Sequence, residues 1–327
     1  MSHAQPLATA DPDSPNSCVS SVGWIGAGRM GAAMVVRLAV PDSPPCVWNR
    51  TRAKAEALTA SGCVAADSIA HLREHDVVFT MVSTAADLKT VLFGTGGLLA
   101  DAANLPRIVV DSSTIDVESS AEIRSDCSDL GVHFVAAPVS GNAKVVEAGR
   151  LTMVVSGDEA AFNEVRPMLA QLAVEVTYAG CEDQARLVKI AHNLMLGVVT
   201  QCLAEVTVLA EKGGVPRHVF LDFLNNSVMG SPFTRYKTPA FVNLDYTPTF
   251  TPILLRKDFD LGLAAARRLR VPVPVVATTA EAVQASIGSG RVGEDFAILL
   301  DLVAAGAGLE LRSEEIVTTD GLSVGDL

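Results

Sequence analysis

A glycine-rich turn between an apolar run and a helical pattern is the feature that most limits how this chain can fold. The apolar residues 22–25 lead into Gly26, and an amphipathic helical pattern begins at Ala32. Gly26 permits a tight turn, Gly28 lets the backbone approach a pyrophosphate, and Gly31 lets the helix pack close to the strand. The free N–H groups of the helix start then face the phosphates. The pattern predicts a dinucleotide site on the residues of this turn, Gly26, Ala27, Gly28, Arg29, Met30 and Gly31.

The position of this turn in the chain favours the dinucleotide site over a plain glycine turn in some other sheet protein. From residue 22 to about residue 178, short apolar runs alternate with helical patterns, which is typical of a parallel sheet built from strand-helix-strand units. The predicted fold class is therefore α/β, with an N-terminal doubly wound Rossmann domain. Strands are expected at residues 22–25, 46–49, 77–82, 107–111, 132–136, 151–156 and 174–178, with helices filling most of the gaps.

The second half of the chain changes character after Cys181, because apolar residues there recur at helical spacing. An all-helical C-terminal domain is expected, joined to the first domain by an unusually long helix that is apolar on most faces. Such a helix requires cover from another domain or subunit, so a homodimer or homotetramer is expected. Helices are predicted at residues 182–212, 216–226, 251–269, 273–287 and 294–305.

These patterns divide the chain into four parts. Residues 1–19 are expected to be a flexible tail, and residues 20–181 the NADP(H)-binding Rossmann domain. Residues 182–308 are expected to form the helical substrate and dimerisation domain, followed by a polar tail at 309–327.

Composition excludes several other classes of protein. The 327 residues are 49% apolar, enough for two packed domains, and the net charge of -12 would repel a phosphate backbone, so no nucleic acid partner is expected. The six cysteines show no metal-ligand or disulfide-framework spacing, so no metal site is predicted. The first nineteen residues do not resemble a secretory signal, and charged and polar residues interrupt the apolar stretch 187–210. A cytoplasmic protein that does not cross a membrane is therefore expected.

The end of the second strand indicates which dinucleotide is bound. NAD sites usually place Asp or Glu there to bind the ribose 2′-hydroxyl, whereas this strand ends in Asn49, followed by Arg50, Thr51 and, one helical turn on, Lys54. Arg can hold a phosphate with paired donors, so NADP(H) is predicted, with NAD(H) as a possible second cofactor. The alternative is a solvated basic helix start, which the helix dipole disfavours.

Lys189 and Asn193 are the candidates for the chemistry. They are one turn apart on the long helix, so their side chains point to the same face. A partly desolvated Lys can supply the proton that the oxygen needs when hydride reaches a carbonyl carbon, and Asn193 could orient it. A surface lysine and a buried core amide are the alternatives, but the flanking residues are mostly apolar.

Several motifs together make the chain resemble the β-hydroxyacid dehydrogenase family, which includes 3-hydroxyisobutyrate dehydrogenase and glyoxylate/succinic semialdehyde reductase. The resemblance covers about residues 22–305. It is carried by Gly26 to Gly31, Asp111-Ser112-Ser113-Thr114, Pro138-Val139-Ser140-Gly141, Gly149 with Leu151, Lys189 with Asn193, and Lys257-Asp258.

The resemblance implies an oxidoreductase that moves hydride between a nicotinamide and a small aldehyde acid or hydroxy acid, with Lys189 as acid/base and Asn193 as its helper. It implies further cofactor contacts at Met81, Val82, Ser83, Thr114 and Lys257. Substrate contacts are implied at Ser113, Ser140, Gly141, Asn142, Phe250 and Asp258. From the residues alone, Thr114 could instead cap the helix that follows it, Ser140 to Asn142 could be an ordinary loop, and Lys257 with Asp258 a solvated helix pair.

Two other functions stay open at this point. An imine reductase would share the architecture, but it is expected to carry Asp or Tyr near position 189, and a non-catalytic cofactor-binding scaffold would be expected to lose Lys189. The sequence from Asn49 to Lys54 resembles the NADPH-using semialdehyde reductase branch of the family. His192 and the segment from Ala143 to Val146 depart from the family pattern, so the substrate stays undefined.

Overall fold

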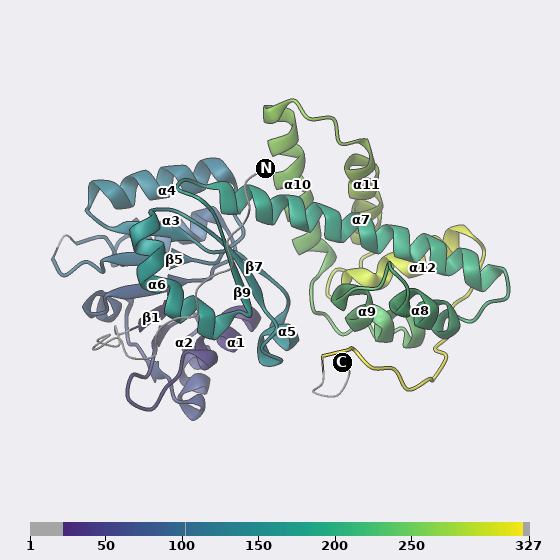
Figure 1. The fold of residues 1–327 in the computed structure, drawn as a ribbon, viewed down its shortest axis with the longest axis horizontal. Coiled ribbons are helices and arrows are strands. Elements are labelled where there is room, and N and C mark those ends of the chain that lie inside the picture. The colour runs from purple at the N-terminus through teal and green to yellow at the C-terminus, as the bar shows by residue number, and fades with distance from the viewer. Residues whose placement is uncertain (1–21, 102, 323–327) are drawn as a thin grey trace, which may run out of the picture.

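The computed structural model describes residues 22–101 and 103–322, which form two lobes joined by one long helix (Figure 1). The sheet lobe comprises residues 22–180, and the helical lobe comprises residues 213–322. Helix α7 (Gln184–Lys212) leaves the sheet lobe and runs across the helical lobe (Figure 1). The tail predicted at residues 1–19 lies outside the described residues.

In the sheet of the first lobe, the order in which successive strands are added reverses at the first strand of the chain. The strands are β1 (Val22–Ile25), β2 (Cys46–Trp48), β3 (Val64–Ala65), β4 (Val77–Thr80), β5 (Ile108–Asp111), β6 (His133–Ala136), β7 (Val139–Ser140), β8 (Thr152–Ser156) and β9 (Glu175–Gly180). Their order is β3-β2-β1-β4-β5-β6-β8-β7, and β9 pairs with β8. Strand β1 lies between β2 and β4 and is parallel to both. Ligands of open α/β sheets bind at such a switch point, beyond the carboxyl ends of the strands.

Helices cover both faces of this sheet because side chains alternate between faces along each strand. Trp24 and Phe79 stack at 5.4 Å between ring centroids in the core on one face, whereas Ile25 and Val78 belong to the core on the other. The first core is closed by α1 (Arg29–Arg37), α5 (Ala143–Glu147) and α6 (Glu159–Leu172). The second is closed by α3 (Ala85–Phe93), α4 (Val117–Asp129) and the 3-10 helix η2 (Ile69–Glu74). Helix α2 (Arg52–Glu56) and the 3-10 helix η1 (Ala57–Ser61) follow β2.

The helical lobe packs around α7. Its helices are α8 (Arg217–Asn226), α9 (Pro232–Asn243), α10 (Pro252–Leu269), α11 (Pro274–Gly288), η3 (Phe296–Ile298) and α12 (Leu299–Gly306). Two glycines let α7 and α10 approach each other closely. A Cβ at Gly197 would lie 2.3 Å from the Phe259 ring, and a Cβ at Gly262 would lie 2.5 Å from Leu194. Larger residues at either position would push the helices apart.

The predicted sheet needs correction in its second half. The alternating pattern predicted a parallel sheet, but β8 is antiparallel to β6 and to β7. The short strands β3 and β7 were not predicted, because two residues give no readable period. Strand β9 extends to Gly180, past the predicted end at residue 178.

The helical half differs from the prediction at two helices. Helix α9 was not predicted, since Pro232 and Pro239 lie within it, but Ser231 and Thr234 form a capping box that begins it. The helix predicted at 294–305 is divided into η3 and α12, and the Asp295 side chain caps η3 by accepting from the N–H of Ala297.

The described part of the predicted polar tail is attached to both lobes. Glu314 accepts from the N–H groups of Arg217 and His218. Farther along, Arg150 of the sheet lobe donates to the carbonyl oxygen of Gly321 at 2.6 Å. Residues 309–322 therefore connect the two lobes along the side of the molecule where the C-terminus lies in Figure 1.

Helix α7 is long and apolar enough to cross a membrane by length and composition alone, and 39% of its most apolar window is buried. Core helices of soluble proteins pass the same test. Arg186 and Asn193 of this helix are buried in polar contacts with the rest of the protein. The helix therefore serves the fold as the connection between the lobes.

Candidate active site

The contacts around the glycine turn explain its three glycines. Gly26 has φ +104°, and a Cβ there would lie 2.2 Å from the carbonyl oxygen of Met81. A Cβ at Gly31 would lie 2.0 Å from the carbonyl oxygen of Gly26. Gly28 begins α1, and a Cβ there would meet no other atom within 4 Å. The backbone at Gly28 thus faces open space beside a helix N-terminus, which fits the pyrophosphate of a dinucleotide.

The polar residues after β2 have two different roles. Asn49 accepts from the N–H of Ala27 at 2.9 Å and donates to the carbonyl oxygen of Thr51 at 2.9 Å, so its side chain holds the glycine turn against the end of β2. Arg50 is 88% exposed and lies 3.7 Å from the carboxylate of Asp87. Lys54 is also exposed. The cations predicted for a 2′-phosphate are therefore accessible, whereas Asn49 is a structural link.

A cleft of about 350 Å³ brings most of the predicted site residues together from both lobes. The predicted residues that line it are Gly28, Arg29, Met30, Gly31, Met81, Val82, Ser83, Ser113, Thr114, Asn142, Phe250, Lys257 and Asp258. Residues that were not predicted also line it, chiefly Lys144 and the segment from Thr247 to Thr249. Arg29 reaches across the cleft and donates to the carbonyl oxygen of Pro248. The predicted residues Ser140, Gly141, Lys189 and Asn193 lie outside this lining.

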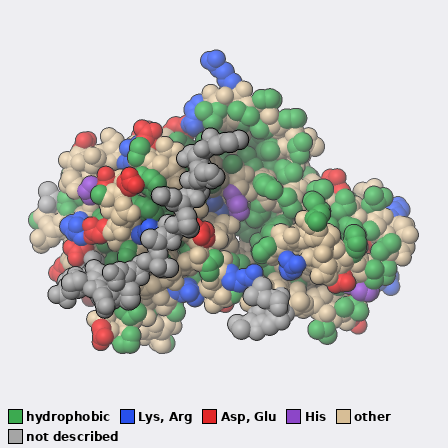
Figure 2. All heavy atoms as spheres, in the orientation of Figure 1, with side chains coloured by type: hydrophobic (Ala, Val, Ile, Leu, Met, Phe, Trp, Pro, Cys, Tyr) green, Lys and Arg blue, Asp and Glu red, His purple; other side chains and the backbone are tan. Residues whose placement is uncertain are grey.

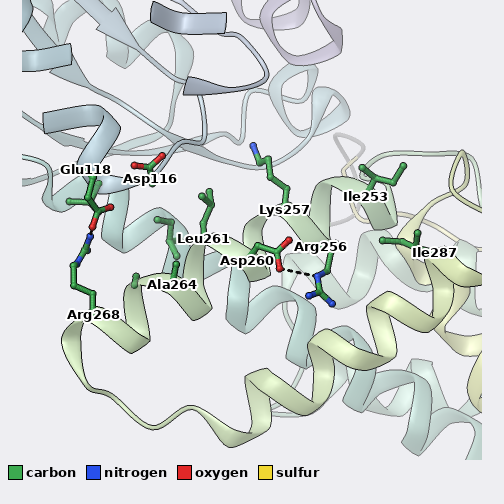
Figure 3. A pocket seen from close by; sticks show the side chains of 13 residues that line it. Asp116, Glu118, Ile253, Arg256, Lys257, Asp260, Leu261, Ala264, Arg268 and Ile287 are labelled. Carbon is green, nitrogen blue, oxygen red and sulfur yellow. Dashed lines mark hydrogen bonds and ion pairs between the residues drawn. The ribbon is translucent and has the colours of Figure 1, made fainter. Parts of the chain in front are cut away.

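A larger hollow of about 800 Å³ lies between α4 and α10, beyond Lys257 (Figure 3). Four of its charged residues form two pairs: Arg256 donates to Asp260 at 3.0 Å, and Arg268 of α10 pairs with Glu118 of α4. The rest of its lining is mostly apolar, as at Leu261 in Figure 3. The smaller cleft is the better candidate site because the glycine turn and predicted site residues of both lobes line it.

A buried network at the end of β5 fixes the first predicted substrate residue. Asp111 is fully buried and accepts hydrogen bonds from Thr80 at 2.6 Å and Ser113 at 2.7 Å. The Ser113 hydroxyl also accepts from the N–H of Val82 at 2.9 Å, so its hydrogen and one of its two lone pairs are used within the protein.

Arg186, which the sequence analysis missed, ties α7 into the same network. Its guanidinium donates to the Asp111 carboxylate at 2.6 Å and to the Ser113 carbonyl oxygen at 2.7 Å. Lys189, one turn along α7, is thereby held close to the carboxyl edge of β5.

Thr114 does not cap the helix that follows it. Asp116 is the N-cap of α4, because its side chain accepts from the N–H of Ser119 at 2.6 Å. The Asp116 carboxylate accepts from the free N–H at the helix start, so Thr114 is not needed there and lines the cleft instead. The alternative interpretation of Thr114 as a cap is wrong.

Lys189, Asn193 and Asp258 form one hydrogen-bonded chain. The Lys189 ammonium donates to Asn193 Oδ1 at 2.8 Å, and Asn193 Nδ2 donates to Asp258 Oδ2 at 2.5 Å. Desolvation of the ammonium group lowers the pKa of Lys189 to about 8, opposed by the negative charge of Asp258 and assisted by the positive charge of Lys257. Burial raises the pKa of Asp258, against the nearby charges of Lys257 and Lys189. A lysine with such a pKa can both give and take a proton near neutral pH.

His192 is a second site residue that the sequence analysis treated only as a departure from the family. Its Nδ1 lies 3.0 Å from Asn193 Oδ1, and its Nε2 lies 3.0 Å from the Ser140 hydroxyl oxygen. Burial, followed by the charge of Lys189, lowers its pKa. The spacing of three residues from Lys189 to His192 places both on one helix face, which is the signal that could have identified it.

Lys257 and Phe250 are residues of the helical lobe that line the cleft. The Lys257 ammonium donates to the carbonyl oxygen of Thr114 at 2.9 Å and of Ser83 at 3.3 Å. The backbone of Phe250 is held in place by two hydrogen bonds. Its N–H donates to the Asp295 carboxylate at 3.3 Å, and its carbonyl oxygen accepts from the N–H of Phe296. Lys257 is thus a link between lobes rather than the solvated helix residue considered above.

The similarity to known proteins extends over nearly all of the two lobes. Residues 21–180 match the NAD binding domain of 6-phosphogluconate dehydrogenase, and residues 184–303 match the domain described as NAD-binding of NADP-dependent 3-hydroxyisobutyrate dehydrogenase. The chain is 31% identical to glyoxylate/succinic semialdehyde reductase 1 of Arabidopsis thaliana over 86% of its own length and 98% of that protein. The chain belongs to the β-hydroxyacid dehydrogenase family. It is therefore an NAD(P)-dependent oxidoreductase that acts on the CH–OH or C=O group of small hydroxy acids.

Solved structures of family members agree with the two-lobe fold. A 3-hydroxyisobutyrate dehydrogenase from Salmonella typhimurium matches with TM-score 0.78 and 28% identity, over 86% of this chain and 99% of that one. A structure of Psf3 in complex with NADP+ and 2-OPP matches with TM-score 0.77 and 26% identity, over 86% and 99%. An imine reductase from Myxococcus stipitatus, at 19% identity and TM-score 0.55, shares the fold alone.

Proposed function

We propose that this β-hydroxyacid dehydrogenase reduces a small aldehyde acid with NADPH, or oxidises the matching 3- or 4-hydroxy acid, with Lys189 as the proton donor and acceptor. The observation that carries the proposal is the chain from Lys189 through Asn193 to Asp258, which joins the catalytic lysine to a carboxylate on the cleft opposite the glycine turn. Retention of Lys189 and Asn193 also disfavours an imine reductase or a non-catalytic scaffold.

A bound nicotinamide would supply or accept the hydride at the carbonyl carbon, and Lys189 would donate or accept the proton at the oxygen. In reduction, the protonated Lys189 donates to the oxygen as negative charge develops on it. In oxidation, neutral Lys189 accepts the hydroxyl proton. Asn193 presents only its carbonyl oxygen to Lys189, because its amide nitrogen donates to Asp258. The Asn193 amide therefore orients the Lys189 ammonium group and does not take its proton.

The substrate carboxylate is proposed to bind at the turn between β7 and α5. Gly141 has φ +140°, and a Cβ there would lie 2.8 Å from Val145, so the turn is compact. Asn142 caps α5, and Lys144 of the same helix lines the cleft and lies 3.8 Å from Asp320. A substrate carboxylate would compete with Asp320 for this ammonium.

NADP(H) is proposed as the preferred cofactor, with NAD(H) as the weaker one. No acidic side chain ends β2, and Asn49 there is engaged with Ala27 and Thr51. Arg50 and Lys54 place positive charge at the position where the 2′-phosphate of NADP(H) would lie.

A homodimer, or a homotetramer built from it, is proposed to cover the helical lobe. Large apolar side chains are exposed on this lobe and near the end of α7, namely Leu209 at 73%, Phe223 at 74%, Met229 at 71% and Val228 at 100%. Figure 2 shows hydrophobic side chains gathered over the helical lobe. Exposed apolar surface of this kind marks an interface in a folded protein.

A substrate panel tests the proposed function. The purified protein is mixed with NADPH or NADH, and cofactor oxidation is followed with aldehyde acids and with cyclic imines, together with the reverse reaction on hydroxy acids. Turnover of aldehyde acids with a preference for NADPH is expected. Turnover of imines alone would contradict the proposal.

A further inference from the structure

A chain of hydrogen bonds connects the catalytic face of α7 to the substrate turn. It runs from Asp258 of α10 through Asn193 and His192 of α7 to Ser140 at the end of β7. Each member has a limited set of donors and acceptors, so the direction of every hydrogen bond can be worked out from its neighbours.

The orientation of the Asn193 amide is fixed from both sides. One of its atoms faces the Asp258 carboxylate at 2.5 Å, and the other faces the Lys189 ammonium at 2.8 Å. A carboxylate only accepts and an ammonium only donates, so Nδ2 must face Asp258 and Oδ1 must face Lys189. Asn193 is 4% exposed, which leaves little water to compensate for a reversed amide.

This orientation determines the tautomer of His192. Its Nδ1 lies 3.0 Å from Asn193 Oδ1, which can only accept, so Nδ1 carries the hydrogen. The pKa of His192 is lowered by burial and by the charge of Lys189, so the ring is neutral at physiological pH. Nε2 is then an acceptor, and the Ser140 hydroxyl 3.0 Å away must donate to it.

The Ser140 hydrogen is therefore used by His192, and only the oxygen lone pairs are left to bind a substrate group. A carboxylate oxygen cannot bond to such a group, whereas a substrate hydroxyl can donate to it. We infer that Ser140, directed by His192, binds a second hydroxyl group of the substrate, so the enzyme prefers acids that carry a hydroxyl beside the one being oxidised. The inference rests on the proposed function. His192 is a positioning residue that acts through Ser140.

The pH dependence of this preference follows from the groups around His192. Lys189 lies on the same helix, Asp258 and Lys257 approach from α10, and Ser140 approaches from β7. Protonation of His192 makes Nε2 a donor, so the Ser140 oxygen accepts from it and the hydroxyl hydrogen is released toward the substrate. Lys189 acts on both kinds of substrate alike, so its titration cancels in a ratio of the two.

A pair of substrates that differ by one hydroxyl group tests the inference. Oxidation of glycerate and of 3-hydroxypropionate is measured with NADP+, and the readout is the ratio of the two kcat/KM values. In the unmodified enzyme the ratio is expected to favour glycerate by about tenfold, the effect of one hydrogen bond. Ser140→Ala and His192→Phe are each expected to bring the ratio close to one.

The two variants are expected to act as one unit. The double variant S140A/H192F should lower the ratio no further than S140A alone. His192 acts on the substrate only through the Ser140 hydroxyl, which S140A has already removed. In the unmodified enzyme the ratio should fall only in acid, below the ordinary histidine pKa of about 6.5, because the pKa of His192 is lowered. His71→Phe, a change at an exposed histidine of η2, is the matched control and should leave the ratio unaltered.

An equal loss with both substrates in S140A would overturn the inference, since Ser140 would then be binding the shared carboxylate. The proposed function would survive that result, because both hydroxy acids would still be oxidised. Oxidation of neither acid, together with turnover of imines, would instead contradict the proposed function and the inference with it.

Discussion

Three nearby features set the proton affinity of Lys189. Desolvation lowers its pKa and the charge of Lys257 lowers it further, while the charge of Asp258 raises it, with a result of about 8. Reduction needs the protonated lysine and oxidation needs the neutral one. The rate of reduction should therefore fall above about pH 8, and the rate of oxidation should rise toward that pH and then level off.

Replacing the carboxylate of Asp258 tests this balance. Asp258→Asn keeps an acceptor for the Asn193 amide but removes the charge that raises the pKa of Lys189. The pKa should fall below about 8, so the alkaline limb of the pH-rate profile for reduction should move to lower pH. Asp260→Asn, at the exposed partner of Arg256 on the same helix, should leave the limb in place. A limb that stays or moves upward in D258N would refute the assignment.

The preference for NADPH should depend on Arg50 and not on Arg52. Arg50 is 88% exposed with one loose partner, whereas Arg52 is held by Glu56 and Asp67, each at 2.7 Å. Arg50→Ala should raise the Kd for NADPH on the order of tenfold and change the Kd for NADH little, because only NADPH carries the 2′-phosphate. Arg52→Ala is the control. Fluorescence titration measures both, and an equal loss for the two cofactors in R50A would argue against a phosphate site.

Helix α7 is the element that fixes the position of Lys189 relative to the sheet lobe. Arg186 at its start is 1% exposed and is paired with the fully buried Asp111 at 2.6 Å. A buried carboxylate without its partner is costly, since it keeps its desolvation penalty and loses the compensating charge. The start of α7 is therefore held by this pair as well as by apolar packing.

Arg186→Met is expected to lower the free energy of unfolding by about 3 to 5 kcal/mol. Arg107→Met, which removes a cation that is 55% exposed and paired with Glu164, should cost about 1 kcal/mol or less. Chemical denaturation of both variants beside the unmodified protein gives the comparison. Similar losses of unfolding free energy in the two variants would show that the buried ion pair stabilises the protein no more than the exposed one.

Elements with local signals could be predicted from the sequence, and those that depend on distant partners could not. The glycine turn and α7 are readable because turn residues and helical periods are local. The antiparallel course of β8 depends on pairing with β6 and β7, and α9 is obscured by Pro232 and Pro239. At the site, Lys189 and Asn193 share a helix face, whereas the bond from Arg186 to Asp111 joins residues far apart in the chain.

At the scale of the whole molecule, apolar side chains remain exposed on the helical lobe and near the end of α7. Leu209 of α7 and Phe223 of α8 are 73% and 74% exposed. Leu209→Lys should shift the protein toward a monomer, because an ammonium group would have to be buried at the interface. Leu130→Lys, a like change on the sheet lobe, should leave the mass unaltered. Light scattering after size exclusion decides this, and an unmodified protein that is already a monomer would contradict the proposed interface.

The central claim is that Lys189 moves the proton, and a Lys189→Met variant tests it most directly. Single-turnover oxidation of NADPH by an aldehyde acid is followed from pH 6 to pH 10, after fluorescence titration has shown that the variant binds NADPH. The account predicts a rate lower by about 10²- to 10⁴-fold, without the decline near pH 8 that the unmodified enzyme should show. A variant that kept both the rate and that decline would contradict it.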